Sequence, residues 1–91
     1  MPMVWVPAPW RDKLTAGVVQ VEVTGATVRQ VIEALEASYP GFHQRIIDAE
    51  TERIRADMAV SVDGEISAEG LRRKVNPDSE VHFLPAMSGG A

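Results

Sequence analysis

Hydrophobic and polar residues alternate along several short stretches of the chain, and a period of two is typical of half-buried strands. The clearest stretch is "VVQVEVTG", in which Val19, Val21 and Val23 fall on one face and polar residues fall on the other. Four more stretches are expected to be strands, namely "MVWV" (3–6), "MAVSV" (58–62), "EIS" (65–67) and "VHFLPAM" (81–87). The pair Asp63-Gly64 favours a tight hairpin turn between two of them.

The segment "TVRQVIEALEASYPG" (27–41) changes to helical spacing. Thr27 stands three residues before Gln30, which is the spacing of a capping box at the start of a helix. The apolar positions form one stripe, which consists of Val28, Val31, Ile32, Leu35 and Tyr39. The polar positions expected to face water are Arg29, Glu33 and Glu36. Pro40 and Gly41 predict the end of this helix.

Two further segments connect these elements. Residues 7–17, "PAPWRDKLTAG", are predicted to be a loop, because prolines interrupt the first strand and cannot donate to a sheet. Residues 42–50 are expected to hold one further helical turn, whose apolar residues fold back on the core; these are Phe42, Ile46 and Ile47.

Strands arranged around one helix in a chain of 91 residues indicate an α+β fold, with a single mixed sheet and one main helix packed across one face. The first and last strands are expected to lie parallel in the centre of the sheet. Residues 1–86 are predicted to form one small domain. Residues 87–91, "MSGGA", are expected to be a flexible tail, because adjacent glycines lose the most backbone entropy on ordering and offer no side chain to bury.

Composition narrows the functional classes. The formal net charge of −4 disfavours nucleic acid as a partner, since a phosphate backbone attracts basic surfaces. No cysteine is present, so the chain has no disulfide, thiolate metal site or cysteine nucleophile of its own. His43 and His82 are isolated, and we expect no metal site. The sequence has neither a basic leader nor an apolar run of membrane-spanning length, which predicts a cytoplasmic protein that does not bind membranes.

Two features have competing interpretations. Trp5 lies in the first expected strand, where an aromatic side chain is usually part of the core. Trp10 lies in the expected loop and is the better candidate for a surface that binds a partner. The basic cluster "LRRKV" (71–75) is expected to be a solvated turn, although it could also dock an acidic partner.

Three segments carry a resemblance to a known family, namely "VWVPAPWRDKLTAG" (4–17), "VEVTGATVRQVIEALEASYPG" (21–41) and "DSEVHFLPAMSGG" (78–90). The order of elements resembles the β-grasp fold of ubiquitin, and these segments resemble the MoaD/ThiS-type sulfur carriers. The resemblance covers nearly the whole chain. It departs from the family in "VDGEISAEGLRRKVNPDSE" (62–80) and at Ala91, because the family's reactive end is normally the carboxylate of a terminal glycine.

The resemblance implies that Gly90, preceded by Gly89, is the reactive residue. A ubiquitin-activating-type enzyme would use ATP to adenylate Gly90, and a sulfur donor would then form a thiocarboxylate. The chain would be a protein cosubstrate and not an enzyme, with no bound cofactor of its own. It would donate sulfur to a synthase that makes cysteine, molybdopterin or a thio-metabolite. Because Ala91 blocks Gly90, we expect a peptidase, such as a metalloprotease, to remove Ala91 first.

The residues that lead into the tail are expected to bind the partner enzymes; these are Phe83, Leu84, Pro85, Met87 and Ser88. An alternative interpretation places Phe83 in the core. Two other functions stay open. One is a ubiquitin-like modifier joined through Gly90 to lysine amines of other proteins, and the other is an interaction domain with an inert tail.

Overall fold

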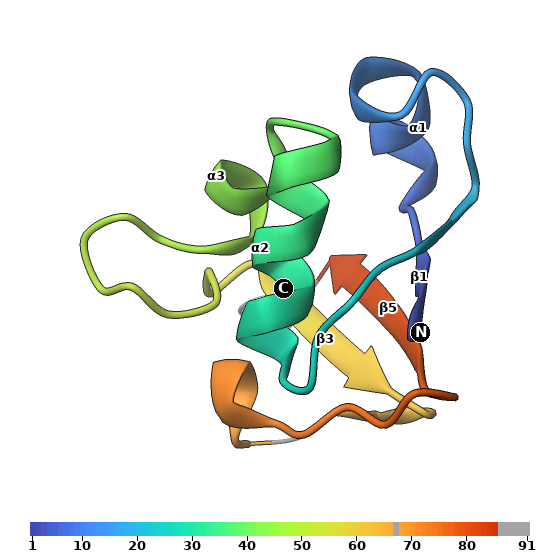
Figure 1. The fold of residues 1–91 in the computed structure, drawn as a ribbon. Helices are drawn as coiled ribbons and strands as arrows, with labels where there is room; N and C mark the ends of the chain where they lie inside the picture. The colour runs from blue at the N-terminus through green and yellow to red at the C-terminus, as the bar shows by residue number, and fades with distance from the viewer. Residues whose placement is uncertain (67, 86–91) are drawn as a thin grey trace.

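The computed structural model describes residues 1–66 and 68–85, and its strands form one five-stranded sheet in the order β2-β1-β5-β3-β4 (Figure 1). The strands are β1 (Met3–Trp5), β2 (Gln20–Glu22), β3 (Met58–Val62), β4 (Glu65–Ile66) and β5 (Glu80–Pro85). β1 runs parallel to β5, and the other neighbouring pairs are antiparallel. The predicted α+β class, the mixed sheet and the parallel pairing of the first and last strands are confirmed.

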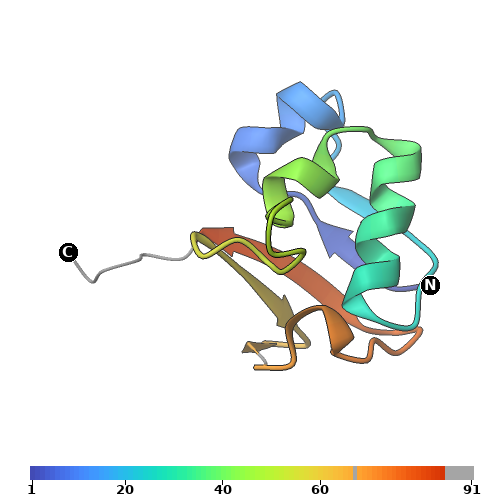
Figure 2. The same ribbon diagram turned by 90° about the vertical axis from the view of Figure 1, so that its left-hand side faces the viewer.

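The helices gather on one side of this sheet (Figure 1, Figure 2). They are α1 (Ala8–Leu14), α2 (Val28–Ser38), α3 (Phe42–Ile46) and the short 3-10 helix η1 (Gly70–Arg72). The main helix and the further helical turn were therefore predicted correctly. The prediction of a loop over residues 7–17 was wrong, because a proline in the first turn of a helix removes only an N–H that has no partner within the helix.

The core lies between the sheet and the helices. Its most deeply buried side chains are Val4, Val31, Ile32, Leu35, Phe42, Ile46 and Val81. The expected stripe of α2 is buried except for Tyr39, which packs against the core and is only partly buried. In the expected second strand, Val21 and Val23 are buried, whereas Val19 lies before β2 begins and is 39% exposed.

Polar side chains fix the starts of two helices, α2 and α3. The Gln30 amide donates to Thr27 Oγ1 at 3.3 Å, and the Ala26 amide donates to Gln30 Oε1 at 2.7 Å, so the predicted capping arrangement is present. Glu36 does not simply face water as expected. Its Oε1 accepts from the amides of His43 at 2.9 Å and Gly41 at 3.0 Å, which caps the start of α3. The bond from His43, followed by that from Gly41, lowers the pKa of Glu36.

Candidate functional site

The expected tail leaves the domain from the end of β5. This strand lies between β1 and β3, and its last residue, Pro85, is paired with Met58 at the start of β3. Because β1 is parallel to β5, the end of β5 lies at the opposite end of the sheet from the N-terminus (Figure 2). The expected tail (87–91), with Met87, Ser88 and the Gly89-Gly90-Ala91 sequence, lies outside the described residues. The part of the candidate site that the structure describes is therefore the end of β5 and the residues around it.

Phe83 and Leu84 point to opposite faces of the sheet. Phe83 is 3% exposed and belongs to the core, so the alternative interpretation holds for this residue and it offers no surface to a partner. Leu84 is 39% exposed, directly before the last residue of β5. Of these two expected partner-binding residues, only Leu84 lies at the surface.

The sheet face opposite the helices carries an aromatic stack. The rings of Trp5 and His82 lie 5.5 Å apart with an angle of 9° between their planes. His82 Nε2 lies 3.8 Å from Glu80 Oε1, on the same face of β5. Ser61 pairs with both His82 and Ile66, which places the exposed Ile66 in the same row of the sheet. We call Trp5, Ile66, His82 and Leu84 the open-face residues.

Trp5 does not lie where it was expected, and the expectation for Trp10 holds in part. Trp5 belongs to the open face and not to the core, whereas Trp10 lies on α1 and packs edge-on against Phe42 with ring centroids 6.0 Å apart. The period of two could have placed Trp5 correctly, because its neighbours Val4 and Val6 are the buried residues of that segment. Trp10 is half-buried and lines a hollow at the surface, so a role in binding a partner stays open for this residue.

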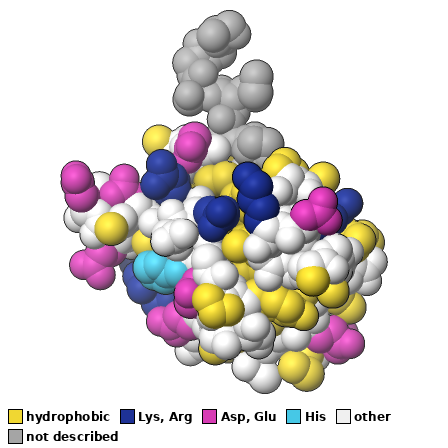
Figure 3. Space-filling model, turned by 90° about the horizontal axis from the view of Figure 1, so that it is seen from above, with side chains coloured by type: hydrophobic (Ala, Val, Ile, Leu, Met, Phe, Trp, Pro, Cys, Tyr) yellow, Lys and Arg dark blue, Asp and Glu magenta, His cyan; other side chains and the backbone are white. Residues whose placement is uncertain are grey.

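A small apolar hollow of about 110 Å³ adjoins the root of the tail. It is lined by Pro7, Pro9, Trp10 and Met58, the last of which pairs with Pro85. Figure 3, which views the molecule from above, shows hydrophobic side chains at the surface with Lys and Arg side chains among them. The end of β5 thus has apolar surface near it on both sides of the sheet.

The start of β5 is anchored by a carboxylate. Asp63, in the turn between β3 and β4, accepts from the Glu80 amide at 2.9 Å and from the Ser79 hydroxyl at 2.8 Å. These two bonds, with the Glu80 bond the larger cause, lower the pKa of Asp63. Asp63 has a φ of 52°, a left-handed conformation that Asp and Asn tolerate better than other side chains do. The anchor fixes the strand that carries the tail.

In residues 1–66 and 68–85, no three His, Asp or Glu side chains are grouped so that they could hold a metal ion. In the same part of the chain, no helix has the length and apolar character needed to cross a membrane.

A helix packed across a mixed sheet whose first and last strands are parallel neighbours defines a ubiquitin-like β-grasp domain. The family model of the ThiS family matches residues 4–90, so the chain belongs to the ThiS family, whose members are ubiquitin-like sulfur carriers. The match includes both glycines of the tail and stops before Ala91. No curated protein matches the sequence significantly.

Solved structures agree with this family. The crystal structure of the Amycolatopsis orientalis BexX/CysO complex contains a chain that is 30% identical, with a TM-score of 0.86 over 99% of this chain and 100% of that one. Mycobacterium tuberculosis CysO is 28% identical, with a TM-score of 0.88 over 96% of this chain and 100% of that one. Small archaeal modifier protein 1 of Methanosarcina acetivorans is 25% identical, with a TM-score of 0.75 over 98% and 95% of the two chains.

Proposed function

We propose that this sulfur carrier works through Gly90. The carboxylate of Gly90, once free, attacks the α-phosphorus of ATP in a partner enzyme, and pyrophosphate leaves. Hydrosulfide then attacks the acyl-adenylate carbon and displaces AMP, and loss of its proton leaves a thiocarboxylate. The observation that carries this proposal is the family match, which runs through the central strand β5 and ends at Gly90.

Glycine suits this position for a physical reason. The reacting carbonyl must enter a narrow activating site, and a residue without a Cβ allows the partner's backbone to approach closely. The strand that precedes Gly89 and Gly90 in the sequence is β5, whose start is held by the bond from the Glu80 amide to Asp63. The domain is then the part that the partner recognises, and Gly90 is the part that reacts.

Ala91 has to be removed before this reaction, because the carbonyl of Gly90 is part of an amide bond while Ala91 follows it. We propose that a peptidase, such as a zinc-dependent metalloprotease, cleaves the Gly90–Ala91 bond. The family match supports this proposal in so far as it stops at Gly90. The mature chain would then end in Ser-Gly-Gly.

The partner that adenylates Gly90 is proposed to be an enzyme of the ubiquitin-activating type. The open-face residues support a docking surface beside the tail, because Leu84 and His82 belong to the strand from which the tail leaves. Large side chains such as Trp5 contribute most of the energy in many interfaces. A second partner is proposed to be a synthase that accepts the sulfur for cysteine, molybdopterin or thio-metabolite synthesis. CysO of Amycolatopsis orientalis was crystallised in complex with BexX.

A second function shares the first chemical step. The similarity to small archaeal modifier protein 1, named as a modifier, favours a role in which activated Gly90 is joined to lysine amines of other proteins. In that case the acyl-adenylate is attacked by an amine or by an intermediate thiol of the partner, and not by a sulfur donor. Products in which the chain is linked to larger proteins would distinguish this function from sulfur transfer.

The exchange of radioactive pyrophosphate into ATP tests the proposal. The adenylating enzyme of the same organism is incubated with the full chain, with a chain that ends at Gly90, and with that shorter chain carrying Gly90→Ala. We expect exchange only with the chain that ends at Gly90. Exchange that is equal with all three chains, or absent with all of them, would contradict activation at Gly90.

A further inference from the structure

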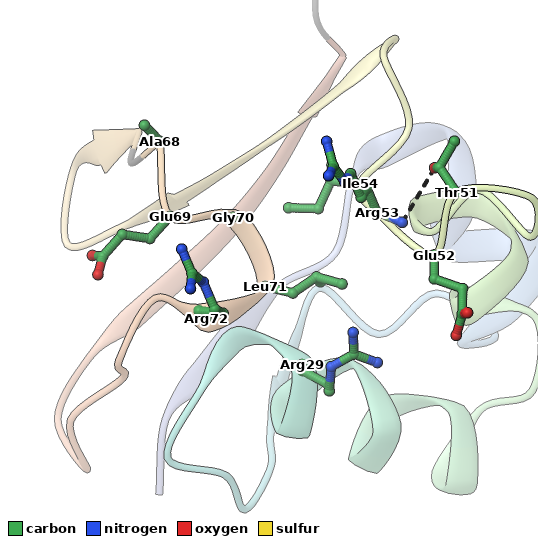
Figure 4. Close-up of a pocket in the computed structure, with 10 residues that line it drawn as sticks. All are labelled: Arg29, Thr51, Glu52, Arg53, Ile54, Ala68, Glu69, Gly70, Leu71 and Arg72. Carbon is green, nitrogen blue, oxygen red and sulfur yellow. Dashed lines mark hydrogen bonds between the residues drawn. The ribbon is translucent and has the colours of Figure 1, made fainter.

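A second hollow lies on the helix side of the molecule and is separate from the open-face residues. It has a volume of about 710 Å³ and is bounded by the first turn of α2, the loop around residues 51–54 and the segment 68–72 that contains η1 (Figure 4). Its apolar lining includes Ile54 and Leu71, of which Leu71 is almost fully buried and Ile54 packs against the core. No residue of this hollow belongs to the open face or to the end of β5.

Three arginines line the hollow, namely Arg29, Arg53 and Arg72 (Figure 4). None of their guanidinium groups has a hydrogen bond or ion pair with another residue in the described part of the chain. The other four arginines all have one: Arg11 and Arg45 donate to backbone carbonyls, and Arg55 and Arg73 pair with carboxylates. The arginines without a partner are therefore the ones that surround the hollow. We call Arg29, Arg53 and Arg72 the arginine triad.

The residues that line the hollow carry more positive than negative charge. Arg29 lies in the first turn of α2, which contains no acidic residue, and the positive end of a helix dipole disfavours a cation there. Two carboxylates, those of Glu52 and Glu69, also line the hollow, so the lining keeps an excess of one positive charge in a chain whose net charge is −4. The positive potential of this hollow stands out against an acidic molecule and attracts anions to it.

The chemistry of the lining selects one kind of occupant. An exposed arginine gains little from a single anion in water, because solvent screens the charge. Carboxylates accept two parallel hydrogen bonds from a guanidinium, and such pairs become stronger when a covering surface excludes water. Ile54, which is only partly buried, adds apolar contact that a bare inorganic anion cannot use. We propose that the hollow is a second docking surface, which binds a protein segment containing both acidic and apolar side chains.

This proposal is independent of the chemistry at Gly90. The arginine triad lies on α2, η1 and the loop between α3 and β3, whereas the tail leaves from β5. A protein bound at the triad would therefore leave the open-face residues accessible to another protein. The surface would allow one carrier molecule to contact two proteins at once, for example an activating and an accepting enzyme.

Chemical-shift mapping of the ¹⁵N-labelled full chain tests the proposal. The probe is a synthetic peptide of alternating Glu and Leu, and the control probe is the same peptide with Gln in place of Glu. We expect the Glu peptide alone to shift the amide signals around Arg29, Arg53 and Leu71, and the shifts to weaken as salt is added. The double variant Arg29→Gln/Arg72→Gln should bind at least about tenfold more weakly. Lys13→Gln, an exposed cation of α1 outside the hollow, should bind as the unaltered chain does.

Several outcomes would overturn the proposal. Equal shifts with the Gln peptide would show that carboxylates are not recognised, and shifts centred elsewhere would show that the hollow is not the site. No shifts at all, or shifts unchanged in the double variant, would show that the arginine triad does not bind the peptide. Inorganic phosphate that reproduces the shifts at the same concentration would identify a simple anion site and not a peptide site. If the double variant does not fold, the salt dependence and the Gln control on the unaltered chain decide the question.

Discussion

The two faces of β5 differ in what covers them. Val81 and Phe83 point to the helix side and are at most 3% exposed, whereas His82 and Leu84 point to the open face and remain partly exposed. The strand is one continuous element, so this difference comes from its surroundings and not from its backbone. The helix-covered face therefore stabilises the fold. The open face leaves His82 and Leu84 partly exposed, and we propose that a partner enzyme docks there.

Leu35→Ala should have the largest effect on the helix-covered face. Leu35 is fully buried on α2, and its truncation leaves a cavity that should lower the free energy of unfolding by about 2 to 5 kcal/mol. Urea unfolding followed by circular dichroism measures this loss. Glu33→Ala, an exposed position of the same helix, serves as the control and should change stability by less than about 0.5 kcal/mol. An unchanged unfolding curve for Leu35→Ala would show that this face does not stabilise the fold.

Leu84→Gln should separate the two faces most clearly. It removes apolar surface from the open face, so binding of the proposed adenylating enzyme should weaken about tenfold, while stability changes by less than about 0.5 kcal/mol. Calorimetric titration and thermal unfolding measure the two quantities. Val19→Gln is a matched control, because Val19 is also 39% exposed and lies before β2. If both variants bind equally well, the open face is not the docking surface.

Glu36→Gln should weaken the helical layer by a smaller amount. The carboxylate of Glu36 accepts from the amides of Gly41 and His43, and loss of such a helix cap costs about 0.5 to 2 kcal/mol. The folded-state pKa of Glu36 is lowered. The difference in free energy of unfolding between the variant and the unaltered chain should therefore be present above pH 4.5, the ordinary pKa of Glu, and should disappear as the pH falls through the lowered pKa. A difference that persists in strong acid would contradict this role of the charge.

Asp63→Asn should have the smallest effect, and it tests the anchor of β5. Asn tolerates the left-handed backbone at this position. The substitution therefore removes mainly the negative charge of the carboxylate, whose oxygens accept from the Glu80 amide and the Ser79 hydroxyl. The folded-state pKa of Asp63 is lowered, so its contribution should be present above about pH 3.8 and be lost as the pH falls through the lowered value. Melting temperatures of both chains across this pH range should converge in acid. Parallel curves would contradict the anchor.

Most of the helix-covered face was predictable from the sequence, because it depends on spacings between residues that are close together in the chain. The period of α2, the pair Thr27 and Gln30 and the valines of β3 and β5 each follow from spacing alone. The α1 helix was missed because prolines at its start were interpreted as ending a strand and not as opening a helix. Glu36 was missed because its partners belong to the next helix, whose position relative to α2 depends on the tertiary fold.

The reactive end of the candidate site stays a prediction, because Gly89 and Gly90 lie outside the described residues. The glycines and the resemblance pointed to the tail, and the period of two placed Leu84 at the surface. The packing of Trp10 depends on α1, and the arginine triad joins residues that are distant in the sequence. Such a grouping follows only from the three-dimensional arrangement of α2, η1 and the loop between α3 and β3.

Intact mass spectrometry shows whether Gly90 becomes the reacting carboxyl group. The full chain and a chain that ends at Gly90 are incubated with ATP, sulfide and an extract of the native host. We predict that the full chain first loses the mass of one alanine residue, and that both chains then gain the mass difference between sulfur and oxygen. Unchanged masses for both chains, including the one that already ends at Gly90, would contradict the account.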